Sequence, residues 1–252
     1  MTTFALLAAA LFLPLFPASM LFSLVYARIA NVWVRMALLL AWPQIGLLVL
    51  VQSGAEPPEW VAYWAVFTAA LYGFRAVALR DLALWTAFMA VASWSLLWVA
   101  VMFGTADVWP YIHAVGLSIP FMLLAWITAR LVAACGAAFA GACGGLAMSM
   151  PRISLVLVLA ILAAVGTPLF PAFFTMLMNV TGAIATLPGV ALAILLVWML
   201  WAWASGQLIR GMVVGPASGE PATDLGRVAT TASLAILGAV AAAGLVAAGR
   251  FT

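Results

Sequence analysis

Long apolar stretches that hold almost no charge constrain this chain more than any other feature. Lysine is absent from the 252 residues, histidine occurs once, as His113, and no Asp or Glu lies near the middle of a long apolar stretch. With 69% hydrophobic and 6% charged residues, the chain lacks the polar groups that a water-facing surface needs. It is therefore expected to be a polytopic integral membrane protein with few titratable groups inside the bilayer.

Eight apolar runs are long enough to cross about 30 Å of hydrocarbon, which takes roughly 20 helical residues. Backbone amides in lipid need hydrogen-bond partners within the protein, so each run is expected to be a helix. The predicted fold class is therefore all-α, with about eight transmembrane helices in a single membrane domain. The predicted spans are residues 4–26, 34–53, 59–79, 82–103, 108–129, 153–177, 189–209 and 228–249.

The arginines indicate how these spans are oriented. Eight of the nine fall in the odd-numbered loops, whereas the even-numbered loops carry Glu56, Glu59 and Asp107 and no basic residue. Because basic loops stay in the cytoplasm, both termini are expected on the non-cytoplasmic side of a bacterial-type inner membrane. The arginines are spaced along the chain and form no cluster that would bind nucleic acid. The eight residues are Arg28, Arg35, Arg75, Arg80, Arg130, Arg152, Arg210 and Arg227.

The segment 131–150 is rich in Gly and Ala and lies between two arginines. A ninth membrane helix here would break the alternation of basic and acidic loops, so a cytoplasmic or interfacial connector is predicted. Cys135 and Cys143 lie in it with no His or acid between them, and they are interpreted as inert small residues. No metal-ligand spacing or cofactor motif occurs in the sequence, so neither a metal nor a cofactor is expected.

Gly166, Pro168 and Pro171 are expected to break the helix predicted over 153–177. Proline lacks a backbone N–H and clashes with the preceding turn of a helix. Two interpretations are open. Broken helices at membrane depth often line an ion or substrate path, but a break is also stable when neighbouring helices satisfy the freed carbonyls.

Four motifs follow one another over roughly residues 60–225: ALYGFRAVALRDLALWTAF, YIHAVGLSIPF, GGLAMSMPRISLVLVLAILAAVGTPLFPAFF and WAWASGQLIRGMVVGP. Their order and spacing resemble the second half of the antiporter-like subunits shared by respiratory complex I, Mrp-type cation antiporters, membrane-bound hydrogenases and DabB-type proteins of inorganic-carbon transporters. The resemblance implies an antiporter-like helical core over 58–227, with two helices before it in 1–57 and a C-terminal helix in 228–252.

The resemblance also implies that the proton-relay residues of this family are replaced. Ala83 follows Asp81 and Leu82 where the family has a relay lysine, and Leu117 follows His113 at the position of another lysine. Met176 stands where a Lys or Glu is expected after the broken helix. Apolar side chains do not exchange protons. A pump of the usual family kind is therefore not expected from this chain alone.

Four polar residues remain as a candidate proton or ion path: His113, Asp81, Thr175 and Asn179. His113 is the one side chain that titrates near neutrality. It is interpreted either as the outer mouth of a path or as an interfacial histidine bonded to a backbone carbonyl or a partner. Asp81 is interpreted either as a helix N-cap with a solvated charge or, because the resembled family keeps an Asp there, as part of a site.

Functions of different classes are consistent with these features. The favoured one is an accessory or structural subunit of an ion-translocating membrane complex, held by other membrane subunits through close helix contacts at Ala and Gly, and by lipid. The alternative is an independent channel or transporter for a small solute through the broken helix. A membrane enzyme acting on lipid or carbon dioxide lacks a visible catalytic constellation, although a place in a redox-driven or carbon-handling complex stays open. The residues available to line a solute path are Ser93, Ser95, Thr167, Thr175, Asn179 and Thr181.

Overall fold

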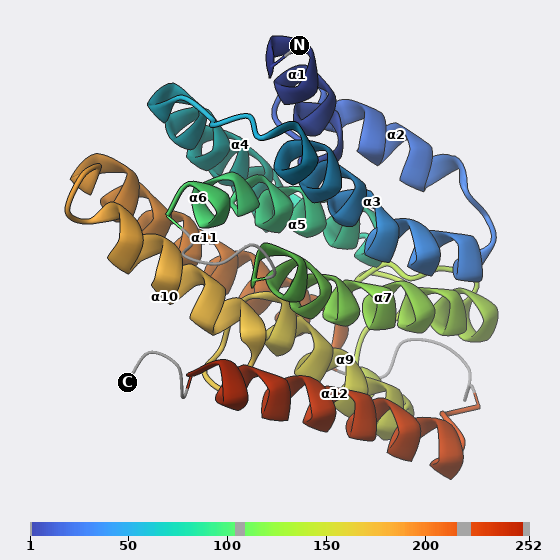
Figure 1. Ribbon diagram of the computed structural model, residues 1–252. Coiled ribbons are helices and arrows are strands. Elements are labelled where there is room, and N and C mark those ends of the chain that lie inside the picture. Colours follow the sequence, from blue (N-terminus) through green and yellow to red (C-terminus); the bar gives the residue numbers. More distant parts are fainter. Residues whose placement is uncertain (1, 104–108, 216–222, 249–252) are drawn as a thin grey trace.

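The computed structural model describes residues 2–103, 109–215 and 223–248, so Asp107 lies outside the described residues. Figure 1 shows helices packed side by side in one bundle, with the two ends of the described chain at different edges of it. In the described ranges the regular structure is helical, with one isolated β-bridge between Asp81 and Phe139. The helices are α1 (Thr2–Phe12), α2 (Ser19–Arg28), α3 (Val32–Ser53), α4 (Glu59–Ala78), α5 (Leu82–Ser95), α6 (Leu97–Phe103), α7 (Trp109–Cys135), α8 (Leu146–Ser149), α9 (Pro151–Ala164), α10 (Pro171–Ala183), α11 (Pro188–Met212) and α12 (Arg227–Ala248).

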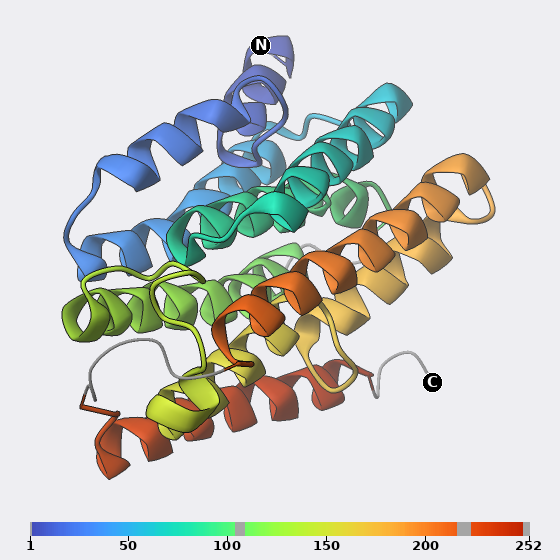
Figure 2. The ribbon, with the colours of Figure 1, turned by 180° about the vertical axis from the view of Figure 1, so that it is seen from behind.

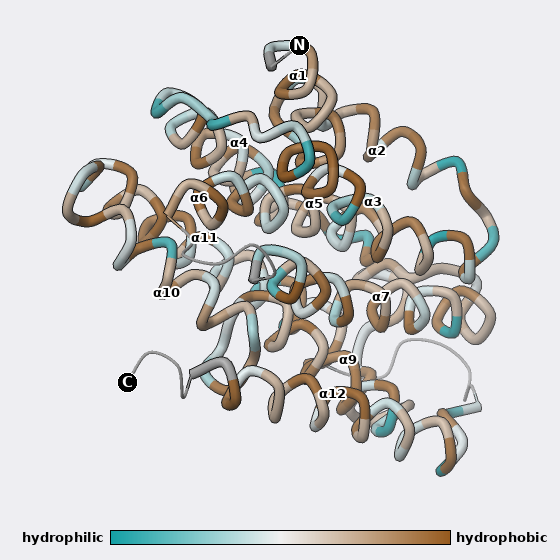
Figure 3. The backbone as a smooth tube through the Cα atoms, viewed as in Figure 1, coloured by the Kyte–Doolittle hydropathy of each residue, from teal (hydrophilic) through white to brown (hydrophobic). Residues whose placement is uncertain are grey.

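Among the described residues, six helical segments are long and apolar enough to cross a membrane: Val32–Ser53, Glu59–Ala78, Leu82–Phe103, Pro110–Cys135, Pro188–Met212 and Arg227–Val246. They match six of the eight predicted spans. Hydrophobic colours run along these helices in Figure 3, and hydrophilic colours gather mostly at helix ends and connections, such as the one from α2 to α3. The all-helical membrane fold is confirmed.

The predicted break after residue 164 is present. Helix α9 ends at Ala164 and α10 begins at Pro171, the first residue of the new helix. Gly166 adopts a φ of 74°, a left-handed conformation that glycine reaches without steric penalty. Leu169 has a φ of 89°, which costs about 1–3 kcal/mol for a residue with a side chain. The surrounding packing must therefore hold this turn in place.

The continuous helix predicted over 4–26 is wrong. The chain forms α1 and α2 instead, with a turn over residues 13–18 that contains Pro14 and Pro17. These prolines remove backbone donors and disfavour the helical conformation of the residues before them. The apolar run continues across the turn, so hydropathy gave no sign of it, but the two prolines did.

Helices α5 and α6 form the central span, and a kink at Leu96 separates them. The hydroxyl of Ser95 donates to the carbonyl of Ala92 at 2.9 Å, and that of Ser93 donates to Met89 at 2.9 Å. Such bonds from a side chain back to its own helix bend helices. Most of this span is buried, including the large side chains of Trp85, Trp94 and Trp98. Helices α2, α4, α7 and α10 pack directly against α5 or α6, which form the core.

Around this core, α3 packs along α7, and α4 packs along α11. The reverse view in Figure 2 shows α4 and α11 running in the same direction. Residues 63–70 of α4 lie near 190–200 of α11, and residues 77–80 lie near 207–211, which requires a parallel pair. A Cβ built on Gly73 would lie 3.0 Å from the Trp201 ring, so the two helices are in close contact near their middles.

Tryptophan indoles satisfy the backbone at the first break. Trp42, Trp64 and Trp98 donate from Nε1 to the carbonyls of Leu11, Phe16 and Leu13, at 3.2, 2.6 and 2.9 Å respectively. These carbonyls face no partner in their own interrupted helix, and an unpaired carbonyl in hydrocarbon costs several kcal/mol. The N-terminal break is therefore held by indole donors from α3, α4 and α6.

The second break uses the same type of donor. Trp198 of α11 donates from Nε1 to the carbonyl of Val165 at 3.0 Å. The hydroxyl of Thr167 donates to Leu162 at 3.0 Å. Position 244 of α12 holds a glycine whose absent Cβ would lie 2.5 Å from the Leu169 carbonyl oxygen. Helix α12 therefore reaches the break only because residue 244 has no side chain.

Replacing Trp98 with Phe tests the role of these donors. The change keeps an aromatic ring but removes the N–H that satisfies Leu13, so the free energy of unfolding is expected to fall by about 1–3 kcal/mol through the orphaned carbonyl. Trp85→Phe is the matched control, because the buried Trp85 Nε1 has no hydrogen-bond partner among the described residues. Reversible unfolding in mixed detergent measures both variants, and an equal loss in the two would contradict this role.

Candidate functional site at the second helix break

His113 and Thr175 meet at the second break. His113 lies near the start of α7 and Thr175 lies near the start of α10, and both side chains are buried. His113 Nδ1 is 2.8 Å from Thr175 Oγ1, and the Thr175 hydroxyl is also 3.0 Å from the Pro171 carbonyl, to which it can donate. A hydroxyl has a single hydrogen. If the Thr175 hydroxyl donates this hydrogen to the Pro171 carbonyl, His113 Nδ1 must donate to the hydroxyl oxygen. This arrangement requires a hydrogen on Nδ1 of the imidazole.

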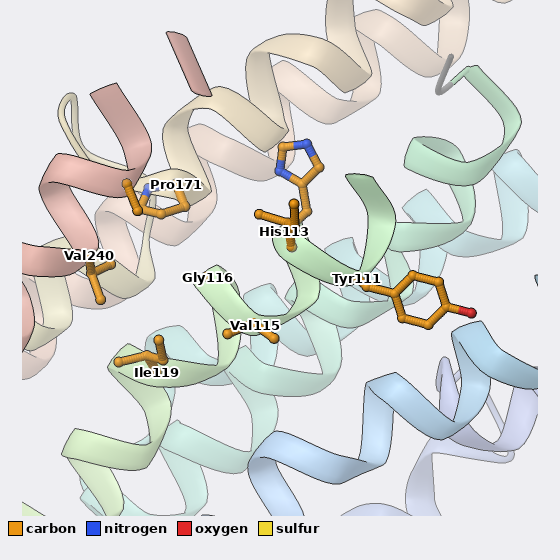
Figure 4. Close-up of a pocket in the computed structure, with 9 residues that line it drawn as sticks. Tyr111, His113, Val115, Gly116, Ile119, Pro171 and Val240 are labelled. Atoms are coloured by element: carbon orange, nitrogen blue, oxygen red, sulfur yellow. The ribbon is translucent and has the colours of Figure 1, made fainter. Parts of the chain in front are cut away.

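An apolar pocket of about 290 Å³ opens beside this pair. Figure 4 shows the His113 ring directed toward α10 while Tyr111 extends away from it, and Pro171 and Val240 border the pocket from the break and from α12. The pocket lining is hydrophobic except for Tyr111 and His113. An apolar cavity of this kind suits hydrocarbon and gives no coordination to a hydrated ion.

Helix α7 reaches the break through a glycine. A Cβ on Gly116 would lie 2.7 Å from Pro171 Cβ. Gly116 is one turn after His113, on the same side of α7. Its lack of a side chain therefore lets α7 approach closely enough for His113 to reach Thr175. The sequence offered no sign of this role, since the glycine lies inside an ordinary apolar span.

Asn179 makes the second polar link from α10. Its Nδ2 donates to the carbonyl of Leu96, at the kink between α5 and α6, at 3.3 Å. Asn179 is almost fully buried, and its Oδ1 has no partner among the residues that the structure describes. Thr175 and Asn179 are one turn apart on α10. Thr175 meets His113 of α7, and Asn179 meets the kink at Leu96.

The hydroxyls predicted to line a solute path are used locally. Ser93 and Ser95 bond to their own helix as described above, Thr167 bonds to Leu162 at the break, and Thr181 is exposed and bonds to Leu177 at 3.0 Å. A hydroxyl that donates to its own helix offers only a lone pair to a solute. In the described part of the chain these residues do not line a continuous polar channel.

The three positions that replace relay residues lie against apolar surroundings. Leu117 and Met176 are 3% and 2% exposed, and Ala83 is partly buried at the start of α5. Met176 is adjacent to Thr175, and Leu117 lies one turn after His113. The candidate site therefore holds a polar pair flanked by hydrophobic side chains, Leu117 and Met176, at two positions where the resemblance led us to expect charge.

Asp81 is a helix cap, and it lies far from His113. Its side chain accepts a hydrogen bond from Leu84 N at 2.8 Å, the geometry of an N-cap. Asp81 pairs with Phe139, just beyond the end of α7, whereas His113 is near the start of α7. The helix runs about 33 Å from His113 to Cys135 at 1.5 Å per residue, so the two residues lie at opposite ends of it. The structure therefore does not join Asp81 to the other three candidates.

The predicted connector contains no long helix after Cys135, although α7 runs six residues beyond its predicted end, to Cys135 instead of residue 129. Cys143 is buried, and its thiol contacts the carbonyl of Ala137 at 2.7 Å. Burial, followed by the neighbouring Cys135 thiol, raises the pKa of Cys143 to about 12. A protonated, buried thiol is a poor nucleophile and metal ligand. No group of His, Cys, Asp or Glu that could hold a metal occurs among the described residues.

Thr175→Val tests the buried pair. Valine keeps the shape but removes the hydroxyl from His113, and the free energy of unfolding is expected to fall by about 1 kcal/mol, the size of an interhelical hydrogen bond in a membrane. The ¹⁵N resonance of His113 Nδ1 should shift in the same variant. Thr175→Ser is the matched control and should preserve both values. An unchanged Nδ1 resonance in Thr175→Val would contradict the contact.

Comparison with known proteins identifies the fold. No family model and no curated protein matches the sequence. Among solved structures, a chain of respiratory complex I from Thermus thermophilus with bound NADH superposes with a TM-score of 0.85 at 19% identity, over 96% of this chain and 54% of that chain. A chain of the Mrp complex from Dietzia sp. DQ12-45-1b superposes with a TM-score of 0.82 at 15% identity, over 99% and 56%.

A third similar chain belongs to the membrane-bound sulfane sulfur reductase, an archaeal respiratory membrane complex, with a TM-score of 0.81, 18% identity and coverage of 97% and 52%. The chain spans about half the length of each of these matches. All three are chains within multisubunit membrane complexes. The resemblance that the motif order indicated is therefore confirmed at the level of the fold: this chain has the helical fold of antiporter-like membrane subunits.

Proposed function

We propose that this chain is a membrane-embedded accessory subunit of a multisubunit ion-translocating complex, and that it does not pump ions by itself. The observation that carries the proposal is the combination of an antiporter-like fold with apolar residues at the three expected relay positions, Ala83, Leu117 and Met176. Proton transfer needs groups that gain and lose charge in the membrane, and such groups are retained where function needs them. The chain keeps the scaffold and lacks these groups.

The broken helices support a structural role. At both breaks the freed carbonyls receive hydrogen bonds from tryptophan or threonine side chains of the same chain. A break that lines an ion path leaves its carbonyls to the ion or to water. Breaks whose carbonyls receive hydrogen bonds from the same chain therefore fit a scaffold better than an independent channel, which was the alternative hypothesis.

The pair His113 and Thr175 joins α7 and α10 through a 2.8 Å contact, and the Thr175 hydroxyl is also 3.0 Å from the Pro171 carbonyl. Among the described residues, the pocket beside the pair is apolar apart from Tyr111 and His113. A relay needs a further titratable group or a water-filled cavity at each end. We therefore assign the pair a positioning role, in which it fixes α10 against α7.

We further propose that each broken pair, α1 with α2 and α9 with α10, crosses the membrane once, giving eight crossings with both termini outside the cytoplasm. The connection from α2 to α3, the end of α7 and the start of α12 lie on one side of the bundle in Figures 1 and 2, as the arginine-rich loops require.

In a variant without native cysteines, Glu56→Cys should react with a membrane-impermeant maleimide in intact cells, and Ala78→Cys should react only after permeabilisation.

Partners are expected because the matched chains belong to multisubunit membrane complexes. Several large apolar side chains of α1 and α2 are exposed in this chain and are available for lipid or a partner. They are Phe4, Leu7, Met20, Leu21 and Leu24.

Affinity purification of the tagged chain in mild detergent tests this role. It should recover a second membrane subunit at fixed stoichiometry, and an intact-complex mass should give that stoichiometry. An unrelated multi-pass protein with the same tag controls for co-solubilised neighbours. Recovery of the chain as a stable monomer or homo-oligomer would contradict the accessory role and favour an independent transporter.

A further inference from the structure

A polar pocket of about 490 Å³ lies where α4 and α11 end together. It differs from the apolar pocket beside His113, because most of its exposed lining is polar. Two arginines, Arg80 and Arg210, and the amide of Gln207 supply this polarity, and none of the described residues that line it is acidic. We call it the arginine pocket. Its remaining lining residues are Val77, Ala78, Leu79, Ala140, Leu208 and Gly211.

The two guanidinium groups are not neutralised within the described structure. Neither makes a hydrogen bond or an ion pair with a described residue. Asp81 is next to Arg80 in sequence, but its carboxylate is engaged at the start of α5 by Leu84 N. Two like charges that share one concave site repel each other. An anion between them would relieve that repulsion.

A simpler explanation is that these arginines complement the negative ends of helices. Arg210 is in the last turn of α11, where a cation is favoured by about 0.3–1 kcal/mol. That explanation accounts for one arginine at one helix end. It does not explain why Arg80, which follows the end of α4, shares the same pocket with Gln207 and with no carboxylate.

The backbone around the arginine pocket is fixed by hydrogen bonds. Ala140 N donates to the carbonyl of Arg80 at 2.9 Å, and Leu82 N donates to the carbonyl of Ala138 at 3.0 Å. Gly211 of α11 approaches Ala140 so closely that a Cβ would lie 3.0 Å from Ala140 Cβ. The connector after α7 therefore ties the turn before α5 to the end of α11. The backbone segments that carry Arg80 and Arg210 are therefore held next to each other.

The location of the pocket indicates where its ligand comes from. Helices α4 and α11 are two of the segments long enough to span a membrane, so their shared end lies at the level of lipid headgroups. Val77 and Leu208 form an apolar wall beside the arginines. Basic pockets between membrane helices bind phospholipid headgroups in general, and guanidinium forks match phosphate oxygens in pairs.

We propose that Arg80 and Arg210 bind one phosphate group between them, and that in the membrane this phosphate belongs to an anionic phospholipid. Gln207 donates a further hydrogen bond to it, and the connector keeps the backbone at Arg80 beside the end of α11. Such a lipid would fill the end of the seam between α4 and α11. The site is independent of ion translocation, and its test does not require a partner subunit.

Native mass spectrometry of the delipidated protein tests the site. The protein is titrated with phosphatidylglycerol and, in parallel, with phosphatidylcholine, which carries a phosphate but no net charge. Wild type is expected to bind phosphatidylglycerol at least tenfold more tightly than phosphatidylcholine. The double variant R80Q/R210Q should lose that preference, and R80K/R210K should retain part of it, because lysine keeps the charge but not the paired geometry.

Arg28→Gln is the matched control for net charge, since Arg28 is exposed and does not line the pocket. It should bind phosphatidylglycerol as wild type does. Inorganic phosphate that displaces the lipid from wild type, but not from R80Q/R210Q, would also support the site and show that free phosphate can use it. Equal binding of both lipids by wild type, or unchanged preference in R80Q/R210Q, would overturn the proposal.

Discussion

The need to pair every backbone carbonyl within hydrocarbon governs this structure. Two of its helices break at prolines, and each break frees carbonyls that lipid cannot solvate. Side chains from neighbouring helices supply the donors, above all the indole N–H groups of Trp98 at the first break and Trp198 at the second. The breaks thus act as junctions that tie α1 and α2 to α3, α4 and α6, and α9 and α10 to α11. Tryptophan serves here as a hydrogen-bond donor as well as a large apolar group.

The same requirement explains how the scaffold tolerates the absence of charge. In a membrane transporter, water and titratable side chains satisfy a broken helix and also carry ions. Here hydrogen bonds within the chain satisfy the carbonyls of the broken helices. Leu117 and Met176 are apolar and buried. The contact between His113 and Thr175 links α7 and α10, and the Thr175 hydroxyl is also 3.0 Å from the Pro171 carbonyl. Under the proposed function, this fold serves as a packing element in its complex.

Much of the fold could be predicted because hydropathy reports directly on membrane helices. Six spans agree with the structure to within a few residues at most of their ends, and the break at Gly166 followed from its prolines. The turn at Pro14 was missed because the surrounding run is apolar throughout, and the kink at Leu96 had no Pro or Gly to mark it. At the site, Thr175 and His113 were both candidates, but their contact depends on the close approach of Gly116 to Pro171, which is a tertiary property.

Proton flux across liposomes tests the central claim most directly. The purified chain is reconstituted alone, a membrane potential is imposed, and internal pH is followed with a trapped dye, beside empty liposomes and beside the complex that co-purifies with the chain. The account predicts that the chain alone gives the flux of empty liposomes, while the complex gives flux that His113→Ala leaves unchanged. Flux through the chain alone that His113→Ala abolishes would contradict it, because His113 would then carry protons.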